Sequence, residues 1–209
     1  MKLSRPLILA SASPRRAELL QQIELPFTVS VGHVHEPPPC PGEDILQWAQ
    51  KTALVKAQAT ALQQATSPVI ILSADTVVVL PTDDNEGGLP LLHNQPAQVL
   101  GKPNDASDAR NMLMALSGRE HTVISAFAIV IHPEGTAITE AVETQVKFRE
   151  LTETEIEEYV ASGEPLDKAG AYGIQGKGAV LIDGICGDYY TVVGLPLARL
   201  WKTLEPWRK

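Results

Sequence analysis

Cysteine is scarce in this sequence: Cys40 and Cys186 are the two present among 209 residues, and they lie far apart. This usage argues against a disulfide framework, and the spacing is unlike that of a cysteine zinc site. Long apolar runs are also missing, and the short apolar stretch after Lys2 and Arg5 does not resemble a signal peptide. We therefore expect a cytoplasmic protein with no membrane partner.

Basic charge is low as well. The chain carries 17 Lys and Arg against 25 Asp and Glu, which gives a formal net charge of -8. Proteins that bind DNA or RNA normally have an excess of Lys and Arg, so we expect no nucleic-acid polymer as a partner. The basic residues that matter must then be placed locally, for a small anion.

The length and the 44% hydrophobic content predict a single domain over residues 1–209, which can comprise two lobes.

Three catalytic signatures are absent too. The sequence contains no G-x-x-x-x-G-K-[ST] phosphate loop, no G-x-S-x-G nucleophile elbow and no H-E-x-x-H zinc helix. These absences argue against a P-loop nucleotidase, a serine hydrolase of the α/β type and a zinc protease.

The most informative segment that is present runs from Leu7 to Arg16. Its apolar start predicts a buried strand, which stops at two serines. Ser13 suits a helix N-cap, and Pro14 suits the first helical position because its missing N–H would be unpaired there. A strand that feeds a helix N-terminus gathers free N–H groups and partial positive charge. With two arginines following, the segment predicts a phosphate site.

Strand and helix patterns alternate along the rest of the chain. We expect further strands at 27–31, 69–79, 122–131, 137–148, 179–182 and 190–193, and helices at 14–23, 43–65, 105–116, 152–161 and 196–204. Residues 81–98, with their Gly, Pro and Asp content, predict an exposed and mobile insertion. This order of elements indicates an α/β fold, with a mixed twisted sheet and flanking helices.

Asp75 is the first candidate for chemistry, because a charged residue follows a fully apolar strand there. Ligands of α/β proteins bind at strand ends, so a functional carboxylate is favoured over a turn cap. Such a carboxylate could hold Mg²⁺ or accept a proton from an attacking water, and the sequence leaves both roles open.

The glycine-rich run from Ser162 to Gly178 allows close approach of backbone to a ligand, although a solvent loop fits its composition equally well.

Together these stretches resemble the Maf family of nucleoside triphosphate pyrophosphatases. The matching segments follow the family order over nearly the whole chain; they are Leu9–Arg16, Ser73–Val78, Gly101–Pro103, Leu116–Gly118, Ser162–Gly176 and Val193–Pro196. The resemblance implies hydrolysis of a nucleoside triphosphate to the monophosphate and pyrophosphate, with a divalent cation, Mg²⁺ or Mn²⁺. It also implies an inosine-triphosphatase-like fold with two lobes around a central cleft, and often a homodimer.

The resemblance assigns roles to individual residues of this chain. Asp75 matches the catalytic carboxylate and, with Glu36, the metal ligands. The matches to residues that contact the triphosphate are Ser13, Arg16, Lys56, Lys102 and Lys168. Glu164 and Asp167 match acidic positions of the cleft. Taken alone, Lys56 and Lys102 are more simply read as solvated charges. Glu36 follows a strand beside prolines, where a turn role and metal binding are equally expected.

Three positions separate the branches of the family. The chain has Arg15, Thr76 and Gln175 there, which is similar to the branch of dTTP/UTP pyrophosphatases. The branch that acts on 7-methyl-GTP has Trp, Gln and Glu at the corresponding positions. The chain departs from the family pattern beside Glu36, at Gly101 and in the long insertion 81–98.

Two other functions fit the same residues. One is a nucleotide-binding regulator of cell division with weak catalysis, which would keep the cations but would not need Asp75. The other is a pyrophosphatase for inosine or xanthosine triphosphate. Turnover of a panel of nucleotides distinguishes all three functions.

Overall fold

The computed structural model describes residues 2–36, 38–64, 67–82 and 89–209. One mixed sheet runs through the molecule in the order β2-β1-β3-β6-β7-β8, and β5 pairs with β3 and β4 beside this path. The strands β1 and β2 are parallel to their neighbours, and the other pairs are antiparallel. The strands are β1 Leu7–Leu9, β2 Phe27–Val29, β3 Val69–Pro81, β4 Leu91–Leu92, β5 Gln95–Leu100, β6 Glu120–His132, β7 Thr136–Phe148 and β8 Ile182–Gly187.

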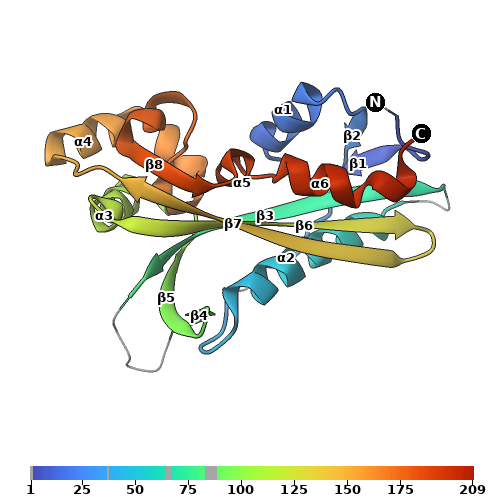
Figure 1. Ribbon diagram of the computed structural model, residues 1–209, viewed down its shortest axis with the longest axis horizontal. Coiled ribbons are helices and arrows are strands. Elements are labelled where there is room, and N and C mark those ends of the chain that lie inside the picture. Colours follow the sequence, from blue (N-terminus) through green and yellow to red (C-terminus); the bar gives the residue numbers. More distant parts are fainter. Residues whose placement is uncertain (1, 37, 65–66, 83–88) are drawn as a thin grey trace.

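Helices cover both faces of this sheet. The α-helices are α1 Pro14–Gln22, α2 Ile45–Ala61, α3 Ala106–Leu116, α4 Glu153–Ala161, α5 Tyr189–Val193 and α6 Leu197–Thr203. Short 3₁₀ segments are η1 Glu164–Asp167, η2 Ala169–Ala171, η3 Gly176–Leu181 and η4 Glu205–Trp207. In Figure 1, α2 crosses one side of the long strands, while α1, α5 and α6 lie on the other side.

Strand alternation explains these two layers, because successive side chains of a strand point to opposite faces. On β3, Ile70 and Leu72 belong to a core with α6, whereas Ile71 belongs to a second core with α2. Ala49, Ala53 and Ala57 give α2 a narrow face, which lets the helix lie close to the sheet. The predicted α/β class, with a mixed sheet and flanking helices, is confirmed; the division into two lobes stays a prediction.

Side-chain caps open three of the longer helices. Asp44 and Asp105 cap α2 and α3 by accepting hydrogen bonds from backbone N–H groups. Thr152 and Glu155 form a capping box at the start of α4, where the T-x-x-E spacing of the sequence predicts one. Ser13 occupies the N-cap of α1 with Pro14 next to it, but among the described residues its side chain makes no capping hydrogen bond.

Two late elements differ from the prediction. Residues 190–193 form part of α5 instead of a strand, because Asp188 caps this helix by accepting from Thr191 N–H and Gly194 ends it at φ 127°. These caps override the strand preference of Tyr, Thr and Val. The expected strand 179–182 is 3₁₀ helix as far as Leu181, and β8 starts one residue later.

The predicted insertion is in part a regular structure. Leu91–Leu92 and Gln95–Leu100 form β4 and β5, and β5 pairs with the end of β3. Residues 83–88 of the predicted insertion lie outside the described residues. In the part of the chain that the structure describes, no helix is long and apolar enough to span a membrane.

His121 lies in an aromatic cluster beneath the glycine-rich run. Its side chain is 1% exposed, and its ring packs edge-on against Phe148 and Tyr172. The Tyr172 hydroxyl lies 2.7 Å from Nε2, while Nδ1 has no hydrogen-bond partner among the described residues. Burial lowers the pKa of His121 from 6.5 to about 4, because the charged imidazolium would lose its hydration.

This burial predicts a loss of stability in mild acid. Between the unfolded pKa of 6.5 and the folded pKa of about 4, the unfolded chain binds a proton at His121 that the folded chain does not. Stability is therefore full above this window and falls as the pH drops through it. Between about pH 7.5 and about pH 5 we expect His121 to contribute a loss of about 2 kcal/mol in the free energy of unfolding.

Urea unfolding of the wild type and of His121→Gln at both pH values measures this loss. The variant is less stable at neutral pH but has the shallower pH dependence. Equal pH dependence in the two proteins would show that His121 does not carry the effect.

Candidate active site

A cleft opens beside the middle of β3. β1 pairs with this strand as far as Leu72, and β5 pairs with it from Val78 onward. Among the described residues, the stretch between them has β6 as its strand neighbour on one side, and its other edge is left for the cleft. The carboxyl end of the parallel strand β1 lies at this edge, and α/β sheets usually bind ligands at the carboxyl ends of parallel strands. The cavity has a volume of about 1030 Å³.

The structure brings nearly all the predicted site residues to this cleft. Those that line it are Ser13, Arg15, Arg16, Glu36, Lys56, Asp75, Thr76, Lys102, Asp167, Lys168 and Gln175. They come from the β1–α1 turn, the loop after β2, α2, β3, the loop after β5 and the glycine-rich run. Segments far apart in the sequence therefore converge on one polar surface.

At the base of the cleft, Lys56 joins two carboxylates. Its Nζ lies 2.6 Å from Asp75 Oδ1 and 2.6 Å from Glu36 Oε2. The side chains of Lys56 and Asp75 are 16% and 11% exposed, while that of Glu36 is 46% exposed. Asp75 Oδ2 is buried and has no hydrogen-bond partner among the described residues. An unpaired buried carboxylate oxygen is costly unless it has a task or a ligand.

Asp75 and Thr76 bring chemistry from the two faces of the sheet to one place. Because side chains alternate along β3, Asp75 faces α2 and Lys56, whereas Thr76 faces α1 and contacts Arg16. The cleft is open at the strand edge, so both sets of groups line it. The Asp75 carboxylate and the Arg16 guanidinium, which the neighbouring Thr76 contacts, thus share one ligand site.

Arg16 is held from three directions. Its Nε donates to the Gly194 carbonyl at 3.0 Å, one terminal nitrogen donates to Ser11 Oγ at 3.0 Å, and the other donates to Thr76 Oγ1 at 3.1 Å. Burial lowers the pKa of Arg16 from its ordinary value, and the Asp75 carboxylate opposes that change. Each terminal nitrogen of a guanidinium carries a second N–H, so Arg16 keeps donors for an anion in the cleft.

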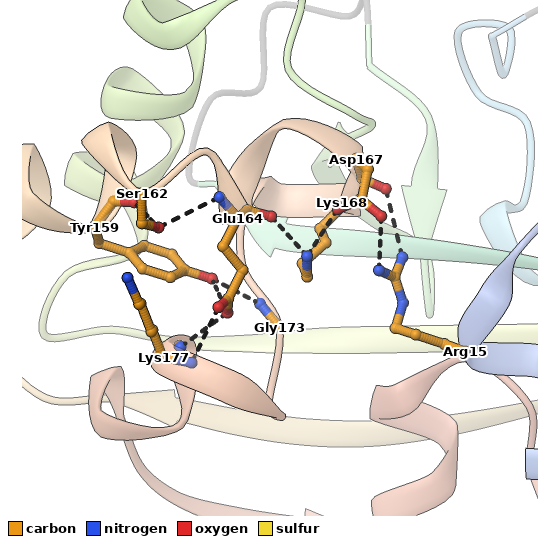
Figure 2. A network of polar contacts seen from close by, with 9 residues as sticks. Arg15, Tyr159, Ser162, Glu164, Asp167, Lys168, Gly173 and Lys177 are labelled. Carbon is orange, nitrogen blue, oxygen red and sulfur yellow. Dashed lines mark hydrogen bonds and ion pairs between the residues drawn. The ribbon is translucent and has the colours of Figure 1, made fainter. Parts of the chain in front are cut away.

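Arg15 reaches across the cleft to the glycine-rich run (Figure 2). It donates to Asp167 Oδ2 at 2.8 Å, and Lys168 Nζ donates to Asp167 Oδ1 at 2.7 Å. Burial acts to raise the pKa of Asp167, but the hydrogen bonds from Lys168 and Arg15 outweigh it and hold the pKa below its usual range. One carboxylate therefore places two cations at the cleft, and none of the three is fixed by its own element alone.

Glu164 lies differently from the expectation, because it does not line the cleft. Its carboxylate accepts hydrogen bonds from the Lys177 and Gly178 N–H groups and from the Tyr159 hydroxyl, as Figure 2 shows. Burial opposes ionisation, but these bonds keep the pKa of Glu164 below its usual value. Gly178 packs so closely against Gly173 and the Tyr159 hydroxyl that a Cβ there would not fit. Glu164 thus folds the loop that carries Lys168 and Gln175.

The other predicted residues keep freer positions. Ser13 is half-buried at the start of α1, and Lys102 and Gln175 are exposed at the cleft. Their side chains can therefore turn toward a ligand without breaking a buried contact.

Three residues that were not predicted as site residues hold Arg16 and Thr76 in place by hydrogen bonds. Ser11 and the Gly194 carbonyl hold Arg16, and Ser125 contacts Thr76 at 2.8 Å. Ser11 belongs to the first motif and could have been included. Ser125 lies inside an apolar strand. The sequence signal that could have identified it is a polar residue at a position that faces the core.

The donor set fits a divalent cation that is shared with a ligand. Among residues 2–36, 38–64, 67–82 and 89–209, no group of three or more His, Cys, Asp and Glu side chains gathers as a metal site. Mg²⁺ is, however, commonly held by one or two carboxylates together with substrate phosphates. The unpartnered Asp75 Oδ2, with Glu36 nearby, matches that arrangement.

The mixed sheet and this cleft, which combines carboxylates with cations from several segments, define an α/β protein suited to a phosphate-bearing ligand. The chain belongs to the Maf family: the family model described as Maf-like protein matches residues 6–207.

Three curated relatives agree with this assignment, and each is named dTTP/UTP pyrophosphatase. The protein from Moorella thermoacetica is 45% identical over 203 residues, covering 95% of this chain and 93% of its own. Those from Dictyoglomus thermophilum and Bacillus cereus are each 41% identical, over 198 and 204 residues. The alignments cover 95% and 96% of this chain, and 94% and 95% of theirs.

Proposed function

We propose that this chain is a nucleoside triphosphate pyrophosphatase that converts dTTP and UTP to their monophosphates and pyrophosphate. The observation that carries the proposal is the Asp75–Lys56–Glu36 contact at the base of a cleft that cations surround. Family membership and the names of relatives at 41–45% identity support it.

The reaction is an in-line attack of water on the α-phosphorus, with pyrophosphate as the leaving group. Asp75 acts on the attacking water through Oδ2, which is buried and has no partner among the described residues. Acceptance of the water's proton and coordination of the cation are the two alternative roles of this oxygen. Lys56 holds Asp75 in place through Oδ1. Arg16 and Lys168 gather on the triphosphate and stabilise the charge that develops as pyrophosphate leaves.

A divalent cation, Mg²⁺ or Mn²⁺, belongs to the proposal, and Asp75 and Glu36 are the residues that would hold it. When bound, it would neutralise charge on the triphosphate oxygens. The proposal also includes a cytoplasmic location and a homodimer, on the basis of the cysteine usage and the family resemblance.

Preference for a pyrimidine base is assigned to Arg15, Thr76 and Gln175. Arg15 and Gln175 lie at the cleft, and Asp167 fixes Arg15 from the opposite wall. The Thr76 hydroxyl is engaged with Arg16 and Ser125, so Thr76 influences the ligand through Arg16. The sequence positions that set substrate choice are thus linked to the cations that hold the triphosphate.

Pyrophosphate release from dTTP, UTP, CTP, GTP and ITP, with Mg²⁺ or Mn²⁺, tests the function. We expect dTTP and UTP to give the highest kcat/KM, and chelation of the metal to abolish turnover. Faster turnover of ITP would instead indicate an inosine triphosphate pyrophosphatase. Tight binding without turnover of any nucleotide would indicate a nucleotide-binding regulator.

Substitution of Asp75 separates catalysis from folding. Asp75→Asn keeps the shape but removes the basic oxygen, so we expect kcat to fall by about a hundredfold or more. The unfolding midpoint should change little, because Lys56 retains Glu36. Asp183→Asn, which alters an exposed carboxylate paired with Lys147, is the control and should retain full turnover. Near-normal turnover in Asp75→Asn would remove Asp75 from the mechanism.

A further inference from the structure

Ser125 is a fully buried hydroxyl that the proposed chemistry does not use directly. It lies in the middle of β6, directly opposite Thr76 of β3 in the strand register. It is not among the residues that line the cleft. A buried serine between apolar neighbours loses hydration, so its hydrogen bonds must serve a purpose in the folded chain.

The direction of these hydrogen bonds can be worked out. A hydroxyl has one proton, and Ser125 Oγ donates it to the Thr191 carbonyl at 2.7 Å. At its 2.8 Å contact with Thr76 Oγ1, Ser125 must therefore accept, and Thr76 donates. With its proton used in this way, Thr76 Oγ1 presents lone pairs to Arg16, which donates to it at 3.1 Å.

Ser125 also controls the second acceptor of Arg16. Thr191, whose carbonyl Ser125 holds, lies in α5, and Gly194 directly follows this helix. The Gly194 carbonyl accepts from Arg16 Nε at 3.0 Å. A Cβ on Gly194 would come within 3.4 Å of Thr76 Oγ1, so this turn and Thr76 are packed closely together. Ser125 thus contacts Thr76, one of the three groups that orient the guanidinium, and the helix α5 that precedes a second, Gly194.

We propose that Ser125 is a positioning residue that orients Arg16 for the triphosphate, and this inference rests on the proposed function. Without the Ser125 hydroxyl, the Thr76 proton turns toward the Gly194 carbonyl, 3.4 Å away. That carbonyl is the one that Arg16 Nε already uses. The carbonyl can accept both bonds, but the turn of the Thr76 proton moves the lone pairs of Oγ1 away from Arg16. One of the contacts that orient the guanidinium then weakens, and anion binding weakens with it while Asp75 and Lys56 stay in place.

The variant Ser125→Ala, with Ser117→Ala as its control, tests this role. Ser117 accepts a hydrogen bond from Leu151 N–H at the end of α3, outside the cleft. We expect Ser125→Ala to raise KM for dTTP about fivefold to tenfold and to lower kcat by a smaller factor, because Arg16 also stabilises the charge on the leaving pyrophosphate. Ser117→Ala should lower the thermal midpoint but leave KM unchanged.

A double-mutant cycle with Arg16→Lys shows whether Ser125 acts through Arg16. Lysine lacks the planar fork, so Ser125→Ala should have little further effect on KM in that background. If Ser125→Ala does not fold, Thr76→Val and Thr76→Ser test the same relay, because only the former removes the hydroxyl. We then expect the higher KM in Thr76→Val.

Calorimetric titration with inorganic tripolyphosphate separates the inference from the proposed function. Suppose that Ser125→Ala binds tripolyphosphate more weakly than the wild type, and that the wild type hydrolyses no nucleotide. This result would support the positioning role and refute the pyrophosphatase. Normal dTTP hydrolysis with an unchanged KM in Ser125→Ala would overturn the positioning role alone. Fully additive effects with Arg16→Lys would also overturn it. A wild type that binds no tripolyphosphate would overturn both.

Discussion

The contact of Lys56 with Asp75 and Glu36 is the interaction on which the cleft depends. Removing a lysine and an aspartate from water costs several kcal/mol per ion, and close pairing must offset that cost. Here one ammonium lies 2.6 Å from each of two carboxylates and joins α2, β3 and the loop after β2. The pairing leaves one Asp75 oxygen unpartnered among the described residues, so the same contact that stabilises the charges also supplies a reactive group.

The alternation of side chains along β3 explains why groups from both faces of the sheet reach the cleft. Asp75 and Thr76 are neighbours on β3, yet they face different helices, so a carboxylate system and a guanidinium system meet at one open strand edge. The glycine-rich run supplies the opposite wall, where Asp167 holds Arg15 and Lys168. The cations are thus placed by partners from other segments, which reduces the motion that a flexible side chain must lose when it binds an anion.

Sequence reasoning identified what depends on local chemistry. The Thr152–Glu155 capping box is encoded within a few residues and is found. Asp75 lines the cleft as expected, but it lies in the middle of β3 and not at a strand end. The helix at 190–193 was missed because its caps, Asp188 and Gly194, lie just outside the segment with strand preference. Ser125 could not be found, since its role comes from the register between β3 and β6, which no local pattern encodes. Glu164 was placed by resemblance in the cleft, whereas its three hydrogen bonds turn it into the loop.

The central claim is that the cleft directs water to the α-phosphorus of a nucleoside triphosphate. Hydrolysis of dTTP in water labelled with heavy oxygen, followed by mass analysis of both products, tests it most directly. The account predicts the label in the nucleoside monophosphate and none in the pyrophosphate. Label in the pyrophosphate, or release of single phosphates in its place, would contradict it.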